Sequence, residues 1–363
     1  MPRTPSTCAC ARSSATSGSA VSRSTIRSMR RPAHDRGIHL PQPAPPAPAW
    51  LRRARRIKQI ADAAMSLPDQ RLAFIGIGKI GLPIAARLAK AGYDVTAFDR
   101  NAERLDEARG LGIVAATSAT EAVRDQTAVV SSLPDDTALR AAMLGDGGLI
   151  AAMTPGTILI ETSTVGVEAS NAVATAAEPR AIAYLRTPVS GNASIAHTGE
   201  LTCFVSGPKE AFARVTPLLA SFTRAQTYLG SAEEARYAKL AVNLMIATTA
   251  AMMAESLALA RKGGIAWPDI LQVLHDSAVA SPMVKYKTAP LLARDFAATF
   301  SCAQMAKDLD LILGAGHAVG VPLQLAAQVR ETYAALIAQG DAETDFLATV
   351  RHVERLSGLG EPV

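Results

Sequence analysis

The spacing of hydrophobic and polar positions changes twice along the chain and divides it into three parts. The first 64 or so residues show no sustained apolar periodicity. From Arg71 onward, short aliphatic runs alternate with longer amphipathic segments, which is typical of strands and helices on a parallel sheet. After about Gly230 only helical spacing continues, as far as Gly340. We therefore predict three parts: residues 1–68, 69–231 and 232–363.

The middle part has the pattern of an α/β domain with a doubly wound parallel sheet. Its aliphatic runs are short and bounded by turn residues, as expected for strands that are buried on both faces. The predicted strands are residues 72–75, 94–98, 128–131, 157–161, 183–186 and 201–206. Helices are expected between them, and the whole predicts an N-terminal Rossmann-type domain.

The third part is predicted to be an all-helical C-terminal domain that begins with one long helix over residues 233–263. The most apolar stretch of this helix, residues 240–254, is bracketed by Lys239 and Glu255 and interrupted by Asn243. That stretch is too short to span a bilayer, so we expect a buried helix and no membrane partner. Its methionines are expected to pack in the core or between domains: Met245, Met252 and Met253.

The positive charge of the chain is concentrated in its first segment. Residues 1–64 hold eleven arginines and one lysine against two aspartates, a net charge of +10, which leaves −5 for the rest of a chain whose total is +5. A mildly acidic body argues against a nucleic-acid partner, because phosphate binding needs clustered cations on the folded domain. The Arg-, Ser- and Pro-rich composition predicts a disordered tail.

Three explanations of this tail stay open: an organelle transit peptide, a basic interaction arm, or sequence upstream of a true start at Met65. We favour the last, because the residues after Met65 lead into the first strand as an N-terminus commonly does. A cytoplasmic location is expected unless the tail is a transit peptide.

The four cysteines have no disulfide or zinc-ligand spacing, so no metal site is predicted: Cys8, Cys10, Cys203 and Cys302.

A glycine motif follows the first predicted strand and opens the next helix. The first glycine of such a motif permits a tight turn, the second lets the backbone approach a pyrophosphate, and the third allows close strand–helix packing. A carboxylate at the end of the second strand, 18 residues after the motif, suits ribose hydroxyls and favours NAD, while the arginine beside it keeps NADP open. The predicted cofactor contacts here are Gly76, Gly78, Lys79, Ile80, Gly81, Asp99 and Arg100.

Six segments in order make the chain resemble the β-hydroxyacid dehydrogenases, which are related to 6-phosphogluconate dehydrogenase. They are FIGIGKIGLPIA from residue 74, SSLPD from 131, ETSTV from 161, TPVSG from 187, KLAVN from 239 and KDL from 307. The resemblance covers residues 72–313. It implies hydride transfer between NAD or NADP and a small carboxylate-bearing alcohol or its carbonyl partner, and a homodimer or homotetramer formed through the helical domain.

The resemblance also implies roles for particular residues. Leu133 and Pro134 would line the cofactor site, with Thr164 near the nicotinamide ribose and Lys307 near the nicotinamide and substrate. Ser190 and Gly191 match the segment that holds the substrate carboxylate, and a loop of backbone N–H groups and a hydroxyl can do so without a competing charge.

Lys239 is the expected general acid/base. Oxidation of an alcohol by hydride loss leaves a proton to be removed, and an ammonium in a partly desolvated cleft has a lowered pKa. Asn243, four residues later, lies on the same helix face and is expected to bind the substrate or orient Lys239.

The chain departs from the usual family pattern directly after Gly191. Asn192 stands where the family commonly has another glycine, so an altered substrate loop with Asn192 as an additional substrate contact is expected. Two alternatives stay open: an imine reductase of the same architecture, against which Lys239 argues, and a non-catalytic dinucleotide-binding module that uses the basic tail.

Overall fold

The computed structural model describes residues 70–145 and 147–361. The basic tail, with the expectations made for residues 1–69, lies outside these residues. Among the described residues a nine-stranded sheet forms, with strand order β3-β2-β1-β4-β5-β6-β8-β7 and with β9 paired to β8. The strands are β1 (Arg71–Ile75), β2 (Asp94–Phe98), β3 (Val114–Ala115), β4 (Ala128–Ser131), β5 (Ile158–Glu161), β6 (Ala183–Arg186), β7 (Val189–Ser190), β8 (Leu201–Ser206) and β9 (Thr223–Gly230).

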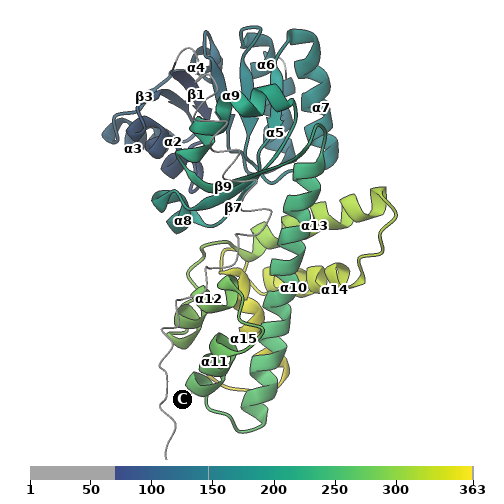
Figure 1. Ribbon diagram of the computed structural model, residues 1–363. Helices are drawn as coiled ribbons and strands as arrows, with labels where there is room; N and C mark the ends of the chain where they lie inside the picture. Colours follow the sequence, from purple (N-terminus) through teal and green to yellow (C-terminus); the bar gives the residue numbers. More distant parts are fainter. Residues whose placement is uncertain (1–69, 146, 362–363) are drawn as a thin grey trace, which may run out of the picture. The chain divides into compact units, whose positions relative to one another are not determined.

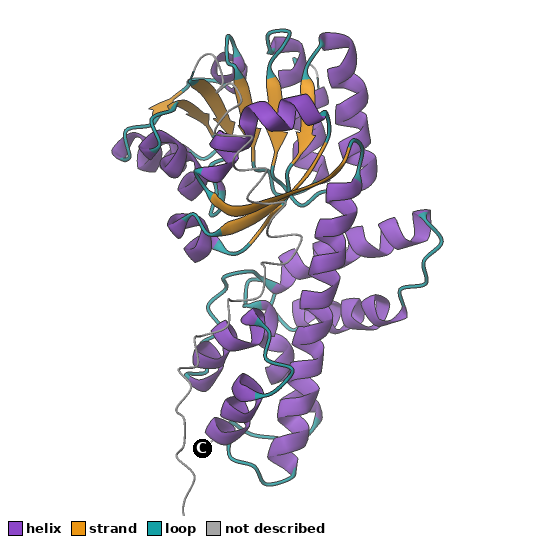
Figure 2. Cartoon of the chain, in the orientation of Figure 1, coloured by secondary structure: helices purple, strands orange, loops and turns teal. Residues whose placement is uncertain are grey.

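The predicted α/β fold class is confirmed, and all six predicted strands are present (Figure 2). The strands β1 to β6 pair in parallel, whereas β8 runs antiparallel to both β6 and β7. The sequence did not predict β3, β7 or β9. Two of these span two residues each, and β9 is a largely exposed edge strand with few aliphatic residues, so none produces a buried aliphatic run.

Helices cover both faces of the sheet, as Figures 1 and 2 show. Side chains alternate between the faces along β1, so that Leu72 and Phe74 join one core and Ala73 and Ile75 the other. The first core is shared with α2 (Gly81–Lys90), α3 (Ala102–Gly110), α8 (Ala193–Thr198) and α9 (Lys209–Ala220). The second is shared with α4 (Ala119–Val123), α5 (Asp136–Leu144), α6 (Leu149–Ala152) and α7 (Val167–Ala177).

The C-terminal region is helical, as predicted. It begins with α10 (Glu234–Lys262), against which α13 (Cys302–Ala318), α14 (Gln324–Ala338) and α15 (Thr349–Leu356) pack. The helices α11 (Trp267–Asp276) and α12 (Pro282–Leu292) complete its apolar core. We propose residues 231–232 as the boundary between the two regions, because β9 ends at Gly230 and α10 begins at Glu234.

The length of α10 and the exposure of its methionines bear on two of the expectations, and only the one about the methionines needs correction. It has 29 residues, and by length and composition alone it is the one described helix long and apolar enough to cross a membrane, although it packs against four other helices. Its methionines do not all lie in the core. Met253 is buried, but the side chains of Met245 and Met252 are 70% and 59% exposed. One face of α10 is therefore apolar and uncovered.

Candidate functional site

The glycine motif forms a tight turn between β1 and α2, as predicted. Gly76 has φ +87°, and a Cβ atom there would lie 2.3 Å from the Ser132 carbonyl oxygen. A Cβ at Gly81 would lie 2.1 Å from the Gly76 carbonyl oxygen, whereas one at Gly78 would meet nothing within 4 Å. The first and third glycines thus permit close packing inside the protein, and the open space over Gly78 fits an approaching pyrophosphate.

Asp99 lies at the end of β2 and faces this turn. Its Oδ2 accepts a hydrogen bond from the Ile77 backbone N–H at 2.9 Å, and its Oδ1 accepts one from the Asn101 N–H at 2.9 Å. The carboxylate is therefore fixed next to the glycine motif. Arg100 and Lys79 are exposed and Ile80 is half-buried, so these three side chains lie at the surface around the turn.

Lys307 on α13 joins the loops that follow β4 and β5. Its Nζ donates to the Pro134 carbonyl at 3.2 Å and to the Thr164 carbonyl at 2.8 Å. The carboxyl ends of β1, β4 and β5 are neighbours in the sheet, so both loops lie at the edge where the glycine motif begins. The structure thus brings Leu133–Pro134, Thr164 and Lys307 together, and it connects α13 with the sheet at that point.

Lys239 lies on α10 and is 8% exposed. Burial lowers the pKa of its ammonium to about 8; the nearby Asp308 carboxylate acts against this shift, and Lys307 adds to it. Asn243, one turn further on, donates through Nδ2 to Asp308 Oδ2 at 2.5 Å, and Asp308 Oδ1 lies 2.9 Å from Lys307 Nζ. Asn243 and Lys307 therefore share the buried carboxylate of Asp308, which also acts on Lys239.

Asp308 was not predicted as a site residue. Its side chain is 1% exposed, and it is the group through which Asn243 and Lys307 are connected. The sequence carried a signal for it, because Asp308 shares its helix face with the apolar residues Met305 and Ile312. An unpaired carboxylate is rarely buried, so such a position indicates nearby cations or amide donors.

The predicted substrate loop lies on and after β7. Ser190 is half-buried, and Gly191 has φ +138° in a place where a Cβ would lie 2.6 Å from a Leu201 methyl group. Asn192 is the N-cap of α8 and accepts from the Ile195 N–H through Oδ1 at 3.0 Å, so the start of that helix fixes the position of its side chain. Among the described residues, no hydrogen bond joins this loop to Lys239.

No group of three or more His, Cys, Asp or Glu side chains suited to a metal ion occurs within residues 70–145 and 147–361. The two cysteines in that part of the chain, Cys203 and Cys302, are buried free thiols, and burial raises the pKa of each above its ordinary value. Neither thiol therefore has the lowered pKa of a reactive cysteine.

Two protein-family models match the two regions of the chain. Residues 71–230 match the NAD-binding domain of 6-phosphogluconate dehydrogenase. Residues 234–353 match the NAD-binding region of NADP-dependent 3-hydroxyisobutyrate dehydrogenase. Both matches agree with the use of NAD or NADP as cofactor.

Curated relatives and solved structures agree with these matches. The NAD-dependent L-serine dehydrogenase of Pseudomonas aeruginosa is 32% identical over 284 residues, which cover 76% of this chain and 95% of that protein. The 3-hydroxyisobutyrate dehydrogenase of the same organism is 32% identical over 283 residues, with the same coverage. The structure of Mycobacterium tuberculosis 3-hydroxyisobutyrate dehydrogenase with L-serine has a TM-score of 0.71 at 28% identity, covering 78% of this chain and 99% of that one.

Proposed function

Because this chain belongs to the β-hydroxyacid dehydrogenase family, we propose that it interconverts a small β-hydroxyacid and its carbonyl partner with NAD or NADP, using Lys239 as general acid/base. The observation that carries this proposal is the cluster of Lys239, Asp308 and Lys307, in which the first two are buried and Lys307 also donates to the loops beside the glycine motif. The cluster supplies an ionisable amine where the cofactor site and the helical region meet.

The bound nicotinamide would accept or supply the hydride, and the residues of the chain manage the proton and the orientation. In the oxidative direction neutral Lys239 Nζ takes the proton from the substrate hydroxyl; in the reductive direction the ammonium returns it to the carbonyl oxygen. A pKa of about 8 keeps both forms of this amine accessible near neutral pH. An unshifted lysine would be almost entirely protonated there.

Asn243, Ser190, Gly191 and Asn192 are the proposed substrate contacts. Asn243 is held by Asp308, so its amide is fixed one helical turn from Lys239. The Ser190–Gly191 segment offers a hydroxyl and backbone N–H groups to a carboxylate. Relatives named for 3-hydroxyisobutyrate and L-serine support substrates of this size that carry a carboxylate and a hydroxyl.

For the cofactor we propose contacts at Gly76, Gly78, Lys79, Ile80 and Gly81, at Asp99 and Arg100, and at Leu133, Pro134, Thr164 and Lys307. A preference for NAD over NADP follows from Asp99, because its carboxylate is fixed beside the turn and would repel a 2′-phosphate. Arg100 is exposed next to it and would offset part of that repulsion.

We also propose that the protein is a homo-oligomer located in the cytoplasm. The exposed apolar side chains Met245, Met252 and Leu259 recur every seven residues on α10 and so share one helix face. A second copy of the chain would cover this face. A sustained apolar stripe of this kind is unusual on a monomer surface.

The proposed activity is tested by following nicotinamide absorbance at 340 nm with the full-length chain. NAD⁺ and NADP⁺ are used separately, each with 3-hydroxyisobutyrate, L-serine and further small β-hydroxyacids, and the reverse reaction is run with their carbonyl partners. Lys239→Ala is the test variant. Lys262→Ala is the matched control, because Lys262 is an exposed lysine at the far end of the same helix.

We expect turnover with at least one β-hydroxyacid. Its rate should fall by about 10²-fold or more in Lys239→Ala and stay unchanged in Lys262→Ala. Cofactor binding should persist in both variants. Tight cofactor binding without turnover in either direction would refute the proposal and favour the imine reductase or the non-catalytic module.

A further inference from the structure

Four buried charged side chains connect the first turn of α10 to the carboxyl ends of β5 and β6. Glu161 and Arg186 are register partners on these two neighbouring strands. Glu161 forms an ion pair with Arg236 of α10, and Arg186 forms one with Glu233, with 2.5 Å between Arg186 Nη2 and Glu233 Oε1. All four side chains are 8% exposed or less. We call these four residues the charge quartet.

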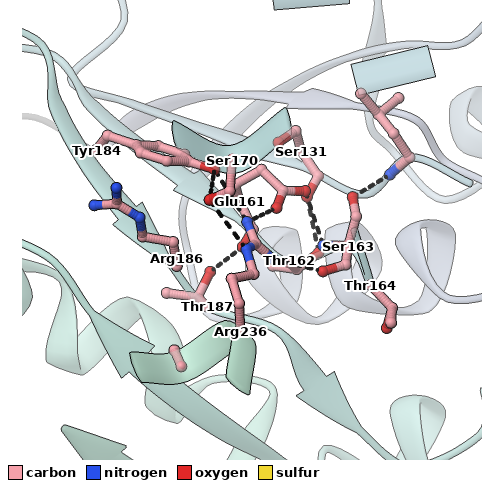
Figure 3. A network of polar contacts seen from close by, with 12 residues as sticks. Ser131, Glu161, Thr162, Ser163, Thr164, Ser170, Tyr184, Arg186, Thr187 and Arg236 are labelled. Carbon is pink, nitrogen blue, oxygen red and sulfur yellow. Dashed lines mark hydrogen bonds and ion pairs between the residues drawn. The ribbon is translucent and has the colours of Figure 1, made fainter. Parts of the chain in front are cut away.

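Arg236 makes more contacts than its ion pair requires (Figure 3). Its Nη1 donates to the Ser163 carbonyl at 2.7 Å, its Nη2 donates to the Tyr184 hydroxyl at 3.0 Å, and its Nε donates to Ser170 Oγ at 3.3 Å. The guanidinium is thus fixed in both position and plane, which a point charge would not achieve.

The same network holds the loops of the proposed cofactor site. Ser163 Oγ accepts from the Leu133 N–H at 2.7 Å, and the Ser163 N–H donates to Glu161 Oε1 at 2.8 Å. Thr164, the next residue, is bound by Lys307 through its carbonyl. The loops after β4 and β5 are therefore held by hydrogen bonds from two helices. Arg236 of α10 binds them through Ser163, and Lys307 of α13 binds the carbonyls of Pro134 and Thr164.

Lys239 follows Arg236 by three residues, which is about 4.5 Å along the axis of a rigid helix. A third strand anchors the same turn, since Ser206 at the end of β8 donates to the Ala232 carbonyl at 2.7 Å and accepts from the Ala235 N–H at 3.2 Å. The start of α10 is thereby bound to β5, β6 and β8, and the position of Lys239 depends on these contacts.

We propose that the charge quartet, with Arg236 at its centre, consists of positioning residues that set Lys239 against the β4 and β5 loops and keep water from its amine. This inference rests on the proposed function for its catalytic meaning, but the placement of Lys239 can be measured without turnover. If the buried ion pairs of the charge quartet served stability alone, breaking one of them would affect Lys239 no more than breaking another buried ion pair of the protein.

The helical region supplies a matched pair of that kind. Lys287 and Asp345 are each 4% exposed, with 2.7 Å between Lys287 Nζ and Asp345 Oδ2, and neither belongs to the proposed site. Lys287→Met is therefore the control for Arg236→Met. Two milder variants, Arg236→Lys and Tyr184→Phe, keep the positive charge of the network while removing part of its hydrogen bonding.

The experiment measures the pH dependence of acetylation at Lys239 by an amine-reactive acetate ester, read by peptide mass spectrometry on the full-length chain without substrate or cofactor. The wild-type midpoint is expected at about 8. Because a displaced first turn admits water, the midpoint should rise toward the ordinary lysine value in Arg236→Met and, to a smaller extent, in Arg236→Lys and Tyr184→Phe. In Lys287→Met it should stay at the wild-type value.

Turnover is measured in parallel, and we expect kcat to fall by about tenfold or more in Arg236→Lys, as for a misplaced catalytic group. If Arg236→Met does not fold, Arg236→Lys and Tyr184→Phe decide. Unchanged labelling midpoints in both, or an equal rise in Lys287→Met, would overturn the positioning role. A wild-type chain without turnover would refute the proposed function alone, because the labelling midpoints still report on Lys239.

Discussion

Two charges of opposite sign act on the pKa of Lys239, each in a known direction. The Asp308 carboxylate raises this pKa, and the Lys307 ammonium lowers it, while burial is the largest influence and lowers it. Asp308 is bound to Asn243 and lies within ion-pair distance of Lys307, so the three polar groups around Lys239 are coupled. Substitution of either charge should therefore move the pH dependence of catalysis.

We predict opposite shifts for Asp308→Asn and Lys307→Met. Loss of the carboxylate lowers the pKa of Lys239, so the midpoint of hydroxyacid oxidation should move to lower pH. Loss of the Lys307 ammonium raises that pKa and should move the midpoint to higher pH. We expect kcat to fall by about tenfold in each, since each variant also disturbs the geometry around the amine. The measurement is kcat against pH, and shifts in the same direction would contradict the assignment.

At the scale of elements, Gly78 and Gly81 differ in their surroundings within the turn from β1 into α2. A side chain at Gly81 would collide with the Gly76 carbonyl, whereas a side chain at Gly78 would meet only open space. The absence of a side chain at Gly81 therefore permits close packing inside the protein. For Gly78 we propose that the open space admits the cofactor.

Gly78→Ala should leave the free energy of unfolding within about 0.5 kcal/mol of wild type but weaken NAD⁺ binding about tenfold or more. Gly81→Ala should destabilise the fold by about 1–3 kcal/mol, because its collision is with backbone. Denaturant unfolding and cofactor fluorescence titration measure the two effects. Equal losses of stability in both variants would show that the turn does not distinguish them.

The elements also show how far sequence reasoning reaches. The strands β1, β2, β4, β5, β6 and β8 and the long helix α10 were predictable, because each produces an aliphatic run or a helical period. The pairing of Arg236 with Glu161 was not, because the two residues lie 75 positions apart and only the folded sheet places them together. The role expected for Lys239 came from its flanking segments and stays a prediction, while the proximity of Asp308 to Lys239 depends on the packing of α13 on α10.

At the scale of the whole molecule, the uncovered face of α10 bears on assembly. Met252 lies at the centre of the apolar stripe and is 59% exposed, so Met252→Glu places a charge where a second copy would pack. We predict that this variant lowers the oligomer mass measured by light scattering at micromolar concentration, while Val273→Glu on α11, at an apolar side chain that is 57% exposed, serves as the control. An unchanged mass for Met252→Glu would place the interface elsewhere.

The most direct test of the account is the pH dependence of kcat/KM for hydroxyacid oxidation, in the wild type and in Lys239→Met. If neutral Lys239 accepts the substrate proton, kcat/KM, which reports the pKa of the amine before substrate binds, is low below that pKa, rises through a midpoint at about 8 and is level above it; reduction shows the reverse dependence. Lys239→Met should lose both the rate and this midpoint. Substantial turnover with the same midpoint in Lys239→Met would contradict the account, because another group would then carry the proton.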